Sequence, residues 1–233
     1  MSYFISERAR QQLFFLVSAG VIALVVTGPR VWASWQGPIS LPLTRHVEGQ
    51  TITSLSSPAV DVTVDPEFAY EGAVRVTLSG NADAELHLFA KLRADGVAQA
   101  FYWIQFEHFL PSNSRRYNAG SPTTIDVGGF QFYYDTLGYA DFQGIQSSQP
   151  GSDGAAAVVI LAQRRHVFPH HVARVRMFHF PDADRRSELM IIYGEALDAS
   201  ASVPEGLPRF PLDAASADAI VERMQHGLII RRR

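Results

Sequence analysis

An uncharged apolar segment near the N-terminus, QLFFLVSAGVIALVVTG at residues 12–28, sets the strongest limit on how this chain can fold. Residues 11–29 carry no charged side chain, and 19 residues span about 28 Å as an α-helix. That length is close to the roughly 30 Å hydrocarbon core of a bilayer. Because the segment is apolar around the whole helix and lies near a chain end, we predict one transmembrane helix.

The predicted span carries two kinds of contact residue. Gly20 and Ala23 are small enough to let a helix of another subunit approach closely. Trp32 and Trp35 follow the span, where amphipathic aromatic rings favour the level of the lipid headgroups. The residues expected to contact lipid are Leu13, Phe14, Phe15, Leu16, Val21, Ile22, Leu24 and Val25.

The charges that flank the span predict its orientation. Arg8 and Arg10 precede it, and Arg30 alone follows closely. The positive-inside bias therefore places the N-terminus in the cytoplasm and the main domain in the periplasm of a single-pass inner-membrane protein. The alternative is a cleaved signal peptide, because small residues at 31 and 33 precede Ser34 with the required spacing.

Charge and cysteine content exclude several classes of function. Only one of the 23 Asp and Glu residues lies before Gln36, against three of the 20 basic residues, so the rest of the chain is mildly acidic. Nucleic-acid binding needs a basic face, and we therefore predict no nucleic-acid partner. Because the chain has no cysteine, it has no disulfide, no thiolate metal site and no cysteine nucleophile.

Downstream of the anchor the hydrophobic period changes from that of a helix to that of a strand. We divide the chain into tail and anchor at 1–35, an extended proline-containing linker at 36–58, and a β-rich domain at 59–233. Alternating or continuous apolar runs bounded by Gly, Pro, Asn and Asp predict about nine strands. They fall at 59–64, 72–78, 84–92, 98–110, 123–127, 130–135, 155–163, 172–180 and 188–195.

The fold class that follows is mainly β, an antiparallel sandwich or a barrel-like domain with a short C-terminal helix at 216–226. Asp213 or Ser216 can cap this helix, and Gly227 ends it. We expect a long loop at 138–154, a central buried strand at 155–163, and a frayed basic tail at 231–233.

Histidines form the one cluster that suggests metal chemistry. His166, His170, His171 and His179 lie close together in sequence, followed by Asp182, Asp184 and Glu188. Imidazole and carboxylate ligands suit zinc, but the spacing matches no metal motif, so we predict no metal site. Glu107 and His108 are neighbours in a strand and therefore face opposite sides, which prevents a direct acid–base pair.

Aromatic residues and arginine pairs are the candidates for protein contacts. The aromatic strands at 98–110 and 130–135 place rings on both faces, so one face needs cover from the domain itself or from a partner. Arginine pairs lie in loops or at strand ends, either as solvated charge or as anchors for an acidic partner. The candidate contacts in the body are Trp103, Tyr133, Arg115, Arg116, Arg185 and Arg186.

No phosphate-binding glycine loop, dinucleotide fingerprint, nucleophile elbow or zinc-protease motif is present in the sequence. A short tail, one span and a β-rich exported domain resemble the layout of many accessory subunits of bacterial membrane complexes. We therefore expect a non-enzymatic accessory or assembly subunit without a cofactor, with membrane lipid and integral membrane proteins as partners. The alternatives are a tethered domain that binds a small apolar or lipid ligand, although a small-molecule ligand is not favoured, and a metal-dependent hydrolase that uses the histidines.

Overall fold

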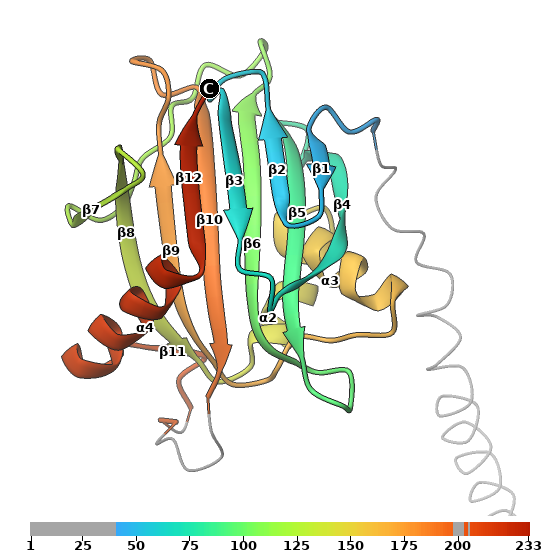
Figure 1. Cartoon of the computed structure of the whole chain (residues 1–233), viewed down its shortest axis with the longest axis vertical. Coiled ribbons are helices and arrows are strands. Elements are labelled where there is room, and N and C mark those ends of the chain that lie inside the picture. Colours follow the sequence, from blue (N-terminus) through green and yellow to red (C-terminus); the bar gives the residue numbers. More distant parts are fainter. Residues whose placement is uncertain (1–40, 198–202, 205) are drawn as a thin grey trace, which may run out of the picture. The chain divides into compact units, whose positions relative to one another are not determined.

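A computed structural model describes residues 41–197, 203–204 and 206–233, and these form a mainly antiparallel β fold with a few helices (Figure 1). The larger sheet has eight strands in the order β11-β8-β9-β10-β6-β5-β4, with β7 paired to β8. The smaller sheet has the order β1-β2-β3-β12. The strands of the larger sheet are β4 (Ala69–Leu78), β5 (Ala82–Leu92), β6 (Ala98–Phe109), β7 (Thr124–Val127), β8 (Phe130–Tyr139), β9 (Val172–His179), β10 (Ser187–Ala196) and β11 (Arg209–Phe210).

The larger sheet is covered on both faces, which gives a sandwich-like arrangement. The smaller sheet, made of β1 (His46–Glu48), β2 (Thr51–Ser54), β3 (Val60–Val64) and β12 (Leu228–Arg232), lies on one face together with α4 (Ala214–His226). Helices α2 (Phe142–Ser147) and α3 (Asp153–Gln163) lie on the other face (Figure 1).

Strand β6 shows why the sequence carries aromatic rings on both faces of this sheet. Tyr102 and Phe106 pack towards the smaller sheet and α4, whereas Phe101 and Trp103 pack towards the helices α2 and α3. All four side chains are buried. The aromatic side chains on both faces of the sheet are therefore buried by other parts of the described chain, the smaller sheet with α4 on one face and α2 with α3 on the other.

Helix α4 confirms the predicted C-terminal helix and begins two residues earlier than expected. The side chain of Asp213 accepts a hydrogen bond from the backbone N–H of Ser216, which makes Asp213 the N-cap. Ile220 and Met224 are buried beneath the helix, and the hydroxyl of Tyr102 donates to the carbonyl of Met224 at 2.7 Å.

The prediction of a strand at 155–163 is wrong, because this segment is the helix α3. Its N-cap is Ser152, whose hydroxyl accepts from the backbone N–H of Ala155 at 3.1 Å. Three successive alanines favour the helix, and a continuous apolar run does not distinguish a strand from a helix by its period. The expected loop at 138–154 is also shorter than predicted, because β8 continues to Tyr139 and α2 follows it.

Both ends of the described body hold more regular structure than the sequence suggested. The expected linker at 36–58 contains β1 and β2. The expected frayed tail is the strand β12, which pairs with β3, and Arg233 forms an ion pair with Asp61 at 3.0 Å. The backbone of Gly128 lies against this strand with φ at +63°. A Cβ atom at this position would lie only 2.1 Å from the carbonyl oxygen of Ile230, so no residue other than glycine fits.

Among the residues that the structure describes, no helix is both long and apolar enough to cross a membrane. The predicted transmembrane segment, with its lipid contacts, Gly20, Ala23, Trp32 and Trp35, lies outside the described residues.

Candidate functional site

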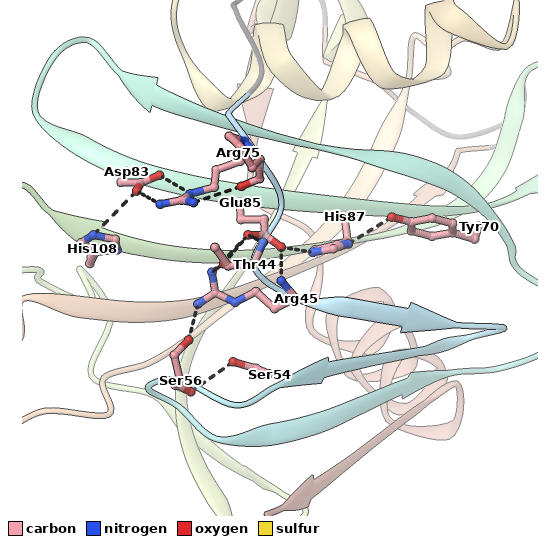
Figure 2. A network of polar contacts seen from close by, with 11 residues as sticks. Thr44, Arg45, Ser54, Ser56, Tyr70, Arg75, Asp83, Glu85, His87 and His108 are labelled. Atoms are coloured by element: carbon pink, nitrogen blue, oxygen red, sulfur yellow. Dashed lines mark hydrogen bonds and ion pairs between the residues drawn. The ribbon is translucent and has the colours of Figure 1, made fainter.

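A buried polar network holds the start of the described chain against the larger sheet (Figure 2). At its centre is Glu85 on β5, whose carboxylate is fully buried. Thr44 donates to it from its backbone N–H at 2.8 Å and from its hydroxyl at 2.6 Å, and the backbone N–H of Arg45 donates at 2.9 Å. The guanidinium of Arg45 lies 3.4 Å from the same carboxylate and 4.4 Å from the ring centre of Phe106.

The remaining members extend this network along β4 and β5. The backbone N–H of Leu41 donates to the carbonyl of Arg75, and the Arg75 guanidinium donates to the carbonyl of Pro42 and to Asp83. Burial alone would raise the pKa of Glu85, but the hydrogen bonds from His87, Thr44 and Arg45 lower it to about 2. Glu85 is therefore ionised wherever the protein is folded near neutral pH.

Glu85, His87 and Tyr70 follow the order of a carboxylate, an imidazole and a hydroxyl, as in a catalytic triad. Nε2 of His87 lies 3.1 Å from Glu85, and its Nδ1 lies 3.2 Å from the hydroxyl of Tyr70. However, His87 is completely buried, and burial together with the charge of Glu85 raises the pKa of Tyr70 to about 12. An activated nucleophile needs the opposite shift and access to substrate, so this network anchors residues 41–45.

Three of the four clustered histidines take separate partners. Nδ1 of His166 lies 2.7 Å from Glu71, that of His170 lies 3.3 Å from Asp141, and that of His179 lies 3.0 Å from the carbonyl of Gln131. Among the described residues, no group of three or more His, Asp and Glu side chains could hold a metal ion. The histidines therefore do not form the shared centre that a metal-dependent hydrolase would require.

A second polar region lies on the opposite face of the sheet, next to α2 and α3. It contains a cavity of about 200 Å³ with Arg174, Arg176, Arg209, Asp153 and Ser152 in its walls. Asp135 pairs with both Arg174 and Arg176. The apolar part of the wall is formed by Trp103, Leu137, Tyr139, Phe142, Met190 and Ile192.

Two largely buried carboxylates, Glu107 and Glu188, lie on the same face of the sheet as this cavity. Glu107 and Glu188 are register partners on β6 and β10. Burial raises the pKa of Glu107, and burial together with the charge of Glu107 raises the pKa of Glu188 to about 8. Glu107 accepts from Tyr117 at 2.7 Å and from Gln105 at 2.6 Å, so it is the better supported anion of the two.

Replacing Glu188 with Gln should change how stability depends on pH. The ordinary pKa is 4.5, so between about pH 4.5 and about 8 the folded protein holds a proton that the unfolded chain has lost. The free energy of unfolding then falls as pH rises, by up to about 1.4 kcal/mol per pH unit. Urea unfolding from about pH 5 to 9 should show that Glu188→Gln removes this slope and is the more stable form at high pH. Equal slopes for Glu188→Gln and the exposed control Glu67→Gln would contradict this assignment.

A third region is an aromatic end of the sheet, which we define as Phe109, Tyr117, Tyr133, Phe180 and Arg185. The rings of Phe109 and Tyr117 stack with centres 4.2 Å apart, and Tyr133 lies 5.8 Å from Phe180. The guanidinium of Arg185 lies over Tyr133 and Phe180, at 5.9 and 5.2 Å from the ring centres. A hollow of about 310 Å³ opens beside these last three residues.

The predicted contact residues are not all part of this aromatic end. Tyr133 and Arg185 belong to it, and Arg115 and Arg116 are exposed in the loop before β7. Arg186 instead binds the carbonyls of Phe109, Leu110 and Asn113, which is a structural role. Trp103 is 2 % exposed, and its indole N–H donates a hydrogen bond to the side chain of Gln105, so Trp103 does not lie on the surface where a partner would bind.

Sequence reasoning missed both polar networks inside the fold. The available signal was a pair of polar, ionisable residues two positions apart in an otherwise apolar strand, Glu85 with His87 and Arg174 with Arg176. Side chains two apart share one face of a strand, so such pairs indicate a polar site on a buried face.

Comparisons with protein-family models, curated proteins and solved structures find no match to this chain.

Proposed function

We propose that this protein is a non-enzymatic accessory or assembly subunit of a larger bacterial membrane complex, of respiratory, photosynthetic, secretion or transport type. The N-terminal apolar segment would lie in the inner membrane with the N-terminus in the cytoplasm. The β body would then act in the periplasm through protein contacts. The observation that carries the proposal is the aromatic end of the sheet.

The aromatic end has the composition of a protein interface. Tyrosine and arginine dominate the energetics of protein contacts because they bury a large area while keeping a polar tip. Tyr133 and Phe180 are only half-buried, and Arg185 covers both rings beside a hollow. Arg115 and Arg116 are exposed in the loop that also carries Tyr117.

The polar network around Glu85 supports the idea of a tethered body. It fixes residues 41–45 to β4 and β5, so the chain that follows the proposed anchor is firmly held where it joins the domain.

Purification of the full chain from native membranes in mild detergent tests this function. We expect companion membrane proteins that are lost when Tyr133→Ser is combined with Arg185→Ala, because truncating contact residues at the centre of an interface weakens binding by about 2 kcal/mol or more. The matched control is Arg93→Ala with Lys91→Ala, which are outside the aromatic end. A monodisperse monomer without companions would contradict the proposal, as would companions that the double variant retains.

A further inference from the structure

We infer that the cavity between α2, α3 and the larger sheet binds a small carboxylate that carries an apolar group. We call it the arginine cavity, lined by Arg174, Arg176, Arg209, Tyr139 and Trp103 among others. This binding site goes beyond the proposed function and does not require a protein partner.

Arg174 gives the strongest indication of an absent acceptor. Its side chain is only 6 % exposed, and its Nε atom is buried without a hydrogen-bond partner among the described residues. One of its other nitrogens donates to Asp135. A buried guanidinium that lacks an acceptor for one of its donors is unfavourable, and because Arg174 lines the cavity, a carboxylate bound there would accept from this guanidinium.

The balance of charge in the cavity wall also favours an anion. Three guanidinium groups line it, and Asp135 is shared by Arg174 and Arg176. Arg209 lies 5.5 Å from the ring centre of Tyr139 and forms no ion pair within the described residues. Burial lowers the pKa of Arg174, and the charges of Arg176 and Arg209 act in the same direction, which an anion would relieve.

Asp153 is the one carboxylate in the wall, and it does not cancel this excess. It begins α3 and accepts a hydrogen bond from the backbone N–H of Gly154 at 2.8 Å. Burial raises its pKa, so its charged form is disfavoured where it lies. The N-terminus of α3 adds partial positive charge at the same wall.

The apolar wall distinguishes a carboxylate with a hydrocarbon group from a bare inorganic anion. Trp103, Leu137, Phe142 and Ile192 would leave a hydrated phosphate in contact with carbon surface. Arginine forks bind planar carboxylates with two parallel hydrogen bonds. A cavity of about 200 Å³ corresponds to roughly seven water volumes, which admits a short alkyl chain or one ring.

The larger cavity beside α4 lacks these features. Although its volume is about 500 Å³, Arg223 donates two hydrogen bonds of 2.7 Å to Glu195, and Lys91 pairs with Glu67 at 2.7 Å. Its cationic groups already have partners, so it gives no comparable reason to expect an anion.

Trp103 provides a direct reporter for the test. The chain has three tryptophans, and a variant with Trp32→Phe and Trp35→Phe keeps only Trp103. Excitation at the red edge of the tryptophan absorption band then reports on Trp103 alone. Titration of this full-length variant in detergent with hexanoate should give a saturable change in Trp103 emission. Hexanamide and hexylamine match hexanoate in length but carry no carboxylate, so they should give no saturable change in Trp103 emission. They also control for partition of the alkyl chain into detergent.

Two arginine variants test the assignment of residues. Arg174→Met should weaken hexanoate binding about tenfold or more, since a charge-assisted hydrogen bond is lost. Arg209→Gln changes an exposed side chain, so it should fold normally and weaken binding several-fold even where Arg174→Met does not fold. The control Arg116→Gln removes an exposed arginine elsewhere and should leave binding unchanged.

Four results would overturn the inference. They are no saturation with hexanoate up to about 10 mM, equal binding of hexanamide, unchanged affinity in the Arg209→Gln variant, and inorganic phosphate binding at least as tightly as hexanoate. The last result would assign the cavity to a phosphate-bearing ligand instead of a carboxylate.

Discussion

Glu85→Ala is expected to be the most destabilising single substitution in the described chain, at about 3–5 kcal/mol. The change leaves the guanidinium of Arg45, which is only 10 % exposed, without its carboxylate, and it removes the acceptor for both backbone N–H groups of residues 44 and 45. For a domain of this size the loss corresponds to a fall in Tm of about 10 °C. Thermal unfolding followed by circular dichroism measures it.

The matched control is Glu67→Ala. Glu67 also pairs with a cation, Lys91, but the two side chains are 65 % and 41 % exposed. An exposed ion pair contributes at most about 1 kcal/mol because water screens it. If both variants unfold at the same temperature, the network around Glu85 does not hold the start of the domain.

The same carboxylate predicts how the fold responds to acid. The pKa of Glu85 is about 2 in the folded state against an ordinary value of 4.5. The stabilisation is therefore complete above about pH 4.5 and is lost as the pH falls towards about 2. Below pH 4.5, the Tm of the wild-type chain should approach that of Glu85→Ala, whereas a constant difference between the two would contradict the lowered pKa.

The second large effect is expected at the C-terminus, where Ile230→Ala should cost about 2–5 kcal/mol. Ile230 is 2 % exposed and packs in the core between the two sheets. Its neighbour Ile229 is 50 % exposed on the opposite face of β12, so Ile229→Ala should change stability by no more than about 0.5 kcal/mol.

This pair of variants tests the strand β12 itself. Both variants replace isoleucine with alanine at adjacent positions, so the change in intrinsic strand propensity is the same in each. The difference between their free energies of unfolding then reports the burial of the side chain. Urea unfolding of both variants gives the difference directly. Equal, small effects would mean that the end of the chain is frayed, as the sequence alone suggested.

Several parts of the fold could be predicted because they depend on local patterns. The alternating residues of 172–180 predicted β9, and the apolar run at 188–195 predicted β10. The glycines at 128 and 129 predicted the turn between β7 and β8, and Asp213 was one of the two N-cap candidates for α4. The helix α3 could not be predicted from periodicity, because its apolar residues form a continuous run.

The polar sites depended on contacts between distant segments. Glu85 binds residues about 40 positions earlier in the chain, and Arg174 pairs with Asp135 across 39 positions. Nothing in the local sequence around either residue specifies its partner. A charged residue in an apolar strand signals that some partner exists, but strand order decides which one.

By itself, the sequence determined the apolar N-terminal segment, the absence of thiol chemistry and the mainly β character of the body, because each follows from composition or from a short-range period. Only the tertiary structure decided that the last residues form a strand, that the aromatic faces are covered from within, and that arginines converge on one cavity. These features arise from contacts between segments far apart in the chain, and in the larger sheet burial on both faces also removes the alternation that shows which side of a strand is buried.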